Sequence, residues 1–151
     1  MSSNPQHSIE RLLSTFISKD ETAIAIARLV LHYCRDISLV NRKYPSADED
    51  SFWSALSEKE TIYRRYWLGT VGDRWKPATH GETDDYDLER LKAITVMSDL
   101  NDRYLVRISF KDPPTDLNNH DVVYLLDRDK SSENGTFRIA WEYTDLNESA
   151  G

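Results

Sequence analysis

The segment YLVRISF at residues 104–110 decides the fold class, because every second residue in it is large and apolar. Strict alternation is typical of a β-strand that packs one face on a core and exposes the other. The segment FRIAWEY at residues 137–143 alternates in the same way and predicts a second strand of this kind. Its expected inner residues are Phe137, Ile139, Trp141 and Tyr143, and its expected outer residues are Arg138, Ala140 and Glu142.

Two more strands are expected beside these segments. Residues 88–97 are rich in β-branched side chains, and residues 121–127 form another apolar run. The polar segment 99–102 and the dipeptide Asn134-Gly135 are turn signals. Successive strands joined in this way predict an antiparallel meander over about 88–143.

The first half of the chain has helical periodicity, and we expect helices over about 5–68. The second of these helices should begin near Ser18, at a capping box, and end before Pro45. Residues 46–68 contain two further segments with capping-box spacing, so they could form two short helices or one bent helix, and we favour two. Residues 70–86 contain glycines and a proline without any period and predict a connecting loop.

Helices followed by an antiparallel meander indicate an α+β fold, in which helices cover one face of a curved sheet. The chain has 151 residues, which suits a single domain over residues 1–151. Hydrophobic residues make up 39% of it, enough for one buried core. Its single cysteine, Cys34, fits a reducing compartment, because no disulfide can form within the chain.

The charge balance bears on the kind of partner. Lys and Arg number 19 and Asp and Glu number 26, so the net charge is −7 with neutral histidines. An acidic chain is poorly suited to non-specific binding of nucleic acid, so we expect a basic partner instead. The most apolar run, residues 23–34, is too short to cross a bilayer, so we expect no membrane span. The first residues lack the pattern of a secretory signal, which favours a cytoplasmic location.

Acidic side chains gather in two segments, one of them in the loop before the sheet. They are Asp48, Glu49 and Asp50, and then Glu82, Asp84, Asp85, Asp87 and Glu89. Such a run is either a solvated rim that maintains solubility or a docking surface for a basic protein. The spacing is not that of an EF-hand loop, so calcium binding is the weaker interpretation.

Catalytic and metal-binding patterns are few. His32 and Cys34 are two residues apart on a predicted helix and point away from each other, so Cys34 is interpreted as a buried structural residue. The four histidines lack zinc-site spacing, and the sequence has no glycine-rich phosphate loop. We therefore expect no cofactor, no metal and no catalytic residue. If the interior is hollow, the acid–base candidates are Asp36, Asp99, Tyr33 and Tyr63.

A little over half of the chain resembles a known family. The resemblance rests on the aromatic residues of the third helical region, the loop that follows it and the four expected strands. The residues that carry it are Tyr63, Tyr66, Trp67, Lys76, Pro77, Asp85, Tyr86, Asp87, Leu91, Ile94, the segments 104–110 and 122–126, and Gly135 to Ile139. This pattern is similar to the nuclear-transport-factor-2-like fold, and more narrowly to the small bacterial immunity proteins built on it.

The resemblance implies a cone-shaped α+β fold and a protein that binds and neutralises a cognate polymorphic toxin, without chemistry of its own. The acidic residues of the two segments would then contact a basic toxin. An isomerase, dehydratase or hydrolase that uses an interior aspartate and tyrosine is the alternative. A scaffold or homodimer that pairs through the outer face of the sheet also stays open.

Overall fold

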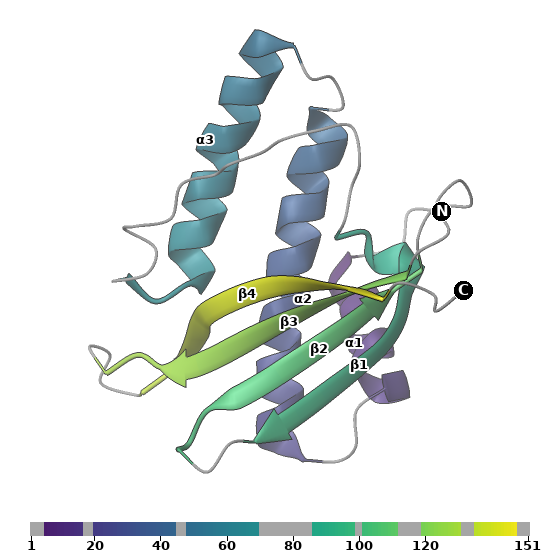
Figure 1. Cartoon of the computed structure of the whole chain (residues 1–151), viewed down its shortest axis with the longest axis vertical. Helices are drawn as coiled ribbons and strands as arrows, with labels where there is room; N and C mark the ends of the chain where they lie inside the picture. Colours follow the sequence, from purple (N-terminus) through teal and green to yellow (C-terminus); the bar gives the residue numbers. More distant parts are fainter. Residues whose placement is uncertain are drawn as a thin grey trace.

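A computed structural model describes residues 5–16, 20–44, 48–69, 86–98, 101–111, 119–130 and 135–147. Within these residues the chain forms three α-helices, one short 3-10 helix and four strands, arranged as Figure 1 shows. The helices are α1 (Pro5–Phe16), α2 (Glu21–Lys43), α3 (Glu49–Tyr66) and η1 (Leu88–Arg90). The strands are β1 (Leu91–Ser98), β2 (Tyr104–Phe110), β3 (Asn119–Arg128) and β4 (Phe137–Asn147).

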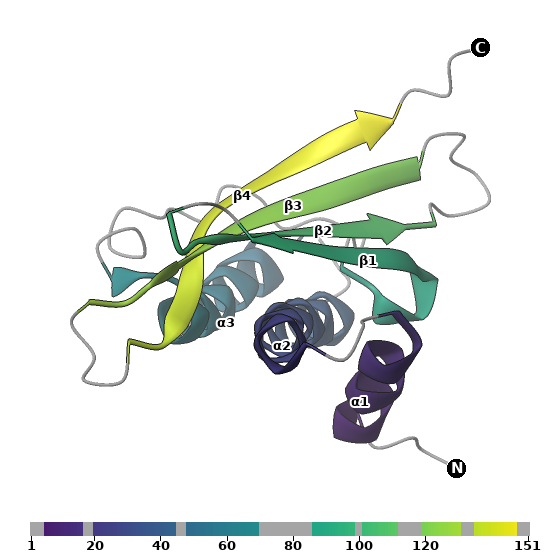
Figure 2. The same ribbon diagram turned by 90° about the horizontal axis from the view of Figure 1, so that it is seen from below.

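The four strands form one antiparallel sheet in the order β1-β2-β3-β4. The three α-helices lie on the same side of this sheet, as the view in Figure 2 makes plain. The α+β class and the antiparallel meander are therefore confirmed. No helix among the described residues is long and apolar enough to cross a membrane.

Two predicted helix boundaries were wrong. Helix α2 starts at Glu21 rather than near Ser18, because the side chain of Asp20 caps it by accepting hydrogen bonds from the backbone N–H groups of Thr22 and Ala23. The region after Pro45 forms one helix, α3, instead of two. It begins behind the cap Asp48, and no proline or glycine interrupts it before Tyr66.

The first strand also starts later than predicted. Asp87 caps the short helix η1 by accepting from the N–H of Glu89, so residues 88–90 turn before β1 begins at Leu91. Residues 70–85 of the predicted loop lie outside the described residues.

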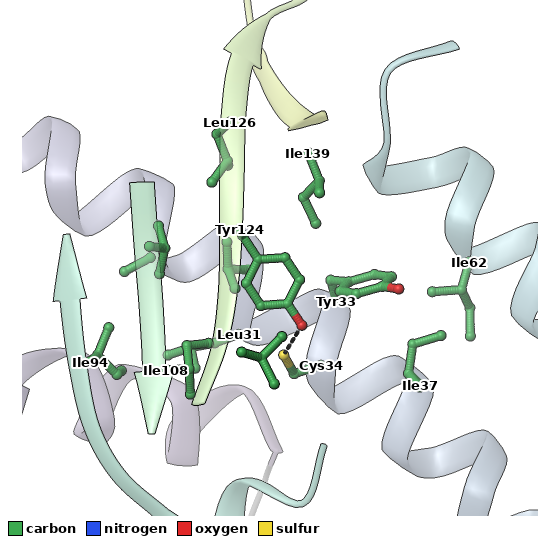
Figure 3. Close-up of a cluster of buried hydrophobic side chains, with 14 of the residues drawn as sticks. Leu31, Tyr33, Cys34, Ile37, Ile62, Ile94, Ile108, Tyr124, Leu126 and Ile139 are labelled. Atoms are coloured by element: carbon green, nitrogen blue, oxygen red, sulfur yellow. Dashed lines mark hydrogen bonds between the residues drawn. The ribbon is translucent and has the colours of Figure 1, made fainter. Parts of the chain in front are cut away.

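The core lies between the sheet and the helices. Helix α2 supplies its centre, because Val30, Leu31 and Cys34 are fully buried there. They pack against inward-facing strand residues such as Ile108 and Tyr124 (Figure 3). The predicted alternation of β2 is confirmed, since Val106, Ile108 and Phe110 are all buried.

Strand β4 departs from the predicted alternation at Ala140. Leu126 pairs with Ile139, but Leu125 pairs with Trp141, so Ala140 is an extra residue in the ladder. Such a β-bulge reverses the facing of every side chain that follows it. The prediction was right for Ile139, which is buried, and wrong for Trp141 and Tyr143, which are 60% and 46% exposed.

Candidate functional site

The bulge in β4 turns Glu142 toward the helices. Glu142 pairs with Tyr124 on β3, whose side chain is fully buried in the core, and paired residues of neighbouring strands share a face of the sheet. Part of Glu142 stays accessible because β4 is an edge strand, but its Oε2 atom is enclosed. The sequence pattern had placed this carboxyl on the outer face.

Phenol groups from several elements surround the Glu142 carboxyl. The hydroxyl of Tyr86, just before η1, donates a hydrogen bond to Glu142 Oε1 at 3.1 Å. The Oε2 atom of Glu142 has no hydrogen-bond partner among the described residues. The Tyr124 hydroxyl lies 3.4 Å from the Cys34 sulfur, as the dashed line in Figure 3 marks.

The rings pack around Tyr33 of α2, whose side chain is buried. Its centroid lies 6.0 Å from that of Tyr124 and 6.3 Å from that of Tyr86, with the rings edge to face. Tyr66 and Trp67 approach it at 5.8 and 6.3 Å, and Tyr63 stacks on Trp67 at 4.0 Å. These distances are those of favourable aromatic pairs in a packed interior.

Burial sets the electrostatics of this cluster. It raises the pKa of the Glu142 carboxyl above the ordinary value, while the nearby hydroxyls of Tyr124 and Tyr86 act in the opposite direction. Burial also raises the pKa values of Tyr33, Tyr86 and Tyr124 well above that of an exposed phenol. The hydroxyls therefore stay neutral and can donate hydrogen bonds at physiological pH.

The predicted acid–base candidates are only partly brought together. Tyr33 and Tyr63 belong to the aromatic cluster, whereas Asp36 accepts hydrogen bonds from the Tyr66 hydroxyl at 2.6 Å and from Arg35 at 2.9 Å. Burial, together with that bond to Asp36, raises the pKa of Tyr66 to about 12. Asp99 lies outside the described residues. The carboxyl that does face the phenols, Glu142, was missed because its position depends on the bulge.

The predicted acidic surface is divided between structural and exposed residues. Asp48 and Asp87 cap α3 and η1, and Asp87 also pairs with Arg42 at 2.9 Å. Glu49, Asp50 and Glu89 are exposed. Glu82, Asp84 and Asp85 lie outside the described residues.

Two described parts of this acidic set come close to the same end of α2. Asp48 begins α3 five residues after α2 ends at Lys43, and Arg42 of the last turn of α2 reaches Asp87. Lys43 pairs with Glu58 at 3.0 Å at this end as well. The surface there mixes both signs of charge, and its acidic character comes from the exposed Glu49, Asp50 and Glu89.

Metal-ligating side chains do not gather in the part of the chain that the structure describes, where no group of three or more His, Cys, Asp or Glu could hold an ion. No protein-family model matches the chain, and neither a curated protein nor a solved structure matches it.

Proposed function

We propose that this chain is a cytoplasmic immunity protein of the nuclear-transport-factor-2-like fold, which binds and neutralises a cognate polymorphic toxin and has no chemistry of its own. The observation that carries the proposal is the exposure of Glu49, Asp50 and Glu89 around one end of α2, none of them paired with a cation among the described residues. The order of helices before an antiparallel sheet, with the α-helices on one face, supports the fold.

The partner that this surface suits is a basic protein. Exposed carboxylates on a chain of net charge −7 attract a basic toxin over several ångströms and speed its encounter. Asp48 and Asp87 contribute by holding the turns that present the exposed residues, and Glu82, Asp84 and Asp85 complete the acidic set in the sequence. A toxin that binds phosphate in a basic cleft would be blocked by carboxylates in that cleft.

Co-expression with the effector encoded beside this gene in its native genome tests the proposal. The wild-type chain should restore growth and bind the purified effector. The triple variant E49K/D50K/E89K should lose both effects with little loss of folding stability, because exposed charges contribute at most about 1 kcal/mol each.

Glu21→Lys is the matched control. Glu21 is also an exposed acid in the first turn of a helix, but it lies at the opposite end of α2. This variant should protect as well as the wild type. Equal protection by the triple variant, or failure of the wild-type chain to protect against the neighbouring effector, would contradict the proposal.

One observation favours a second candidate function, an isomerase, dehydratase or hydrolase. The Glu142 carboxyl has a raised pKa, and its enclosed Oε2 atom has no hydrogen-bond partner among the described residues. A buried carboxyl of this kind is a candidate for proton transfer. Glu142 and Tyr86 would then act where the sequence suggested an interior aspartate and tyrosine. Glu142→Gln separates the two candidates, because an enzyme would lose its turnover and an immunity protein would still protect.

A further inference from the structure

The most exposed large hydrophobic side chain among the described residues is that of Trp53, at 62%. It lies in the second turn of α3, outside the stripe of that helix that packs on the core. In Figure 1 the first turns of α3 project past the end of α2, away from the sheet. Packing of the core therefore does not account for this indole, and Trp is strongly enriched at binding hot spots.

Phe52 supports the indole of Trp53. The two ring centroids are 5.4 Å apart and the ring planes meet at 86°, which is an edge-to-face pair. Phe52 itself is partly buried. A ring that is already supported in this way loses little conformational freedom when a partner binds, so the indole is preorganised for a contact.

Two carboxylates share the face of α3 that carries Trp53. Glu49 and Asp50 precede it by four and three residues, the spacing at which helical side chains are neighbours. Both are exposed, and neither forms an ion pair among the described residues. The positive end of the helix dipole accounts by itself for acids in a first turn. It does not account for an exposed indole beside them.

The charges select the kind of group that suits this indole. A nucleobase can stack on an indole, but its phosphates would meet the two carboxylates. A second copy of the chain would bring the same negative charges, and an apolar side chain would bury the carboxylates without a partner. A cation is favoured on both counts, because the face of an indole attracts it and carboxylates pair with it.

We propose that Trp53, Glu49 and Asp50 bind an arginine side chain of a basic partner protein, with the guanidinium stacked on the indole and hydrogen-bonded to a carboxylate. Arginine fits better than lysine, because its planar guanidinium stacks on aromatic rings and donates two parallel N–H bonds to one carboxylate. The inference rests on the proposed function, and it names the side chain by which the acidic surface would hold the basic toxin.

Calorimetry of the full chain with the effector encoded beside its gene is the first test. Trp53→Ala should raise the dissociation constant at least about tenfold, as truncation of a hot-spot residue does. Trp53→Phe should raise it less, because a benzene ring attracts a cation more weakly than an indole. Trp141→Ala is the matched control, since Trp141 is 60% exposed but lies on β4, and it should bind like the wild type. Circular dichroism confirms that each variant is folded.

A peptide titration tests the arginine contact without the effector. The probe is acetyl-Gly-Arg-Gly-amide, and its citrulline analogue has nearly the same shape without the charge. The arginine peptide should shift the indole N–H signal of Trp53 in NMR saturably in the millimolar range, because an exposed cation–π contact is weak. The citrulline peptide should leave this signal in place, and E49Q/D50Q should weaken binding of the arginine peptide at least about twofold.

Failure of this inference and failure of the proposed function give different results. An effector that binds Trp53→Ala as tightly as the wild type, but no longer binds E49K/D50K/E89K, would overturn the inference and leave the proposed function in place. An effector that does not bind the wild-type chain would remove the proposed function, and the peptide titration would then decide the inference. Equal shifts with the arginine and citrulline peptides, or a shift with neither, would overturn it.

Discussion

The two halves of β4 differ in what they place inside the molecule. Before Ala140 the strand follows the predicted pattern, and Ile139 is fully buried. After Ala140 the aromatic residues Trp141 and Tyr143 face solvent, and the carboxyl of Glu142 faces the core. One extra residue in the ladder thus accounts for both the buried carboxyl of Glu142 and the exposed side chains of Trp141 and Tyr143. Alternation predicts that a strand forms, but the pairing decides which face is buried.

Truncation of a β4 side chain to alanine should lower the free energy of unfolding most at a position before the bulge. Ile139→Ala removes a fully buried side chain beside Leu126 and should lower the free energy of unfolding by about 2–5 kcal/mol. Chemical denaturation measures this loss. A decrease below about 1 kcal/mol would place Ile139 outside the core.

The buried carboxyl of Glu142 should have a smaller effect on the free energy of unfolding, and this effect should depend on pH. Because the pKa of Glu142 is raised in the folded protein above the ordinary 4.5, the folded form binds this proton more tightly than the unfolded chain. The resulting stabilisation is complete below the unfolded pKa and is lost as the pH rises through the raised folded pKa. Each pKa unit between the folded and unfolded states corresponds to about 1.4 kcal/mol in the free energy of unfolding.

Glu142→Gln removes this titration. The free energy of unfolding of the variant should therefore fall less than that of the wild type as the pH rises from about 4.5 toward neutrality. Denaturation at a series of pH values gives the two profiles. Parallel profiles across this range would show that the carboxyl is solvated.

Trp141→Ala should have the smallest effect on folding, even though it removes the larger side chain. Trp141 is 60% exposed, so its truncation should lower the free energy of unfolding by less than about 1 kcal/mol. A loss as large as that of Ile139→Ala would mean that the strand alternates without a bulge.

Much of the fold could be predicted because its signals are local. Residues 104–110 carry their own alternation, and Pro45 ends a helix wherever it occurs. Asp20, which caps α2, lies within the predicted capping box. The prediction was therefore wrong only in placing the cap at Ser18 instead of Asp20. The single helix α3 was the less favoured of two interpretations, because the second capping-box spacing, which also occurs inside a continuous helix, was interpreted as a new helix start.

The candidate site could not be predicted because its groups meet only through pairing between distant segments. Ala140 has no feature that marks a bulge, and only its partners Leu125 and Leu126 on β3 define it. Tyr86 reaches Glu142 from 56 positions earlier in the chain. Tyr33 and Tyr63 could be named as candidates because both lie on predicted helices, which requires no knowledge of β4.

Titration of the Glu142 carboxyl carbon by NMR, assigned by comparison with Glu142→Gln, tests whether the bulge at Ala140 carries this side chain into the phenol cluster. We expect a pKa above the ordinary 4.5 of a glutamate, and a further rise in Tyr86→Phe, which lacks the hydroxyl that donates to Oε1. A pKa at or below 4.5 that does not respond to Tyr86→Phe would contradict it.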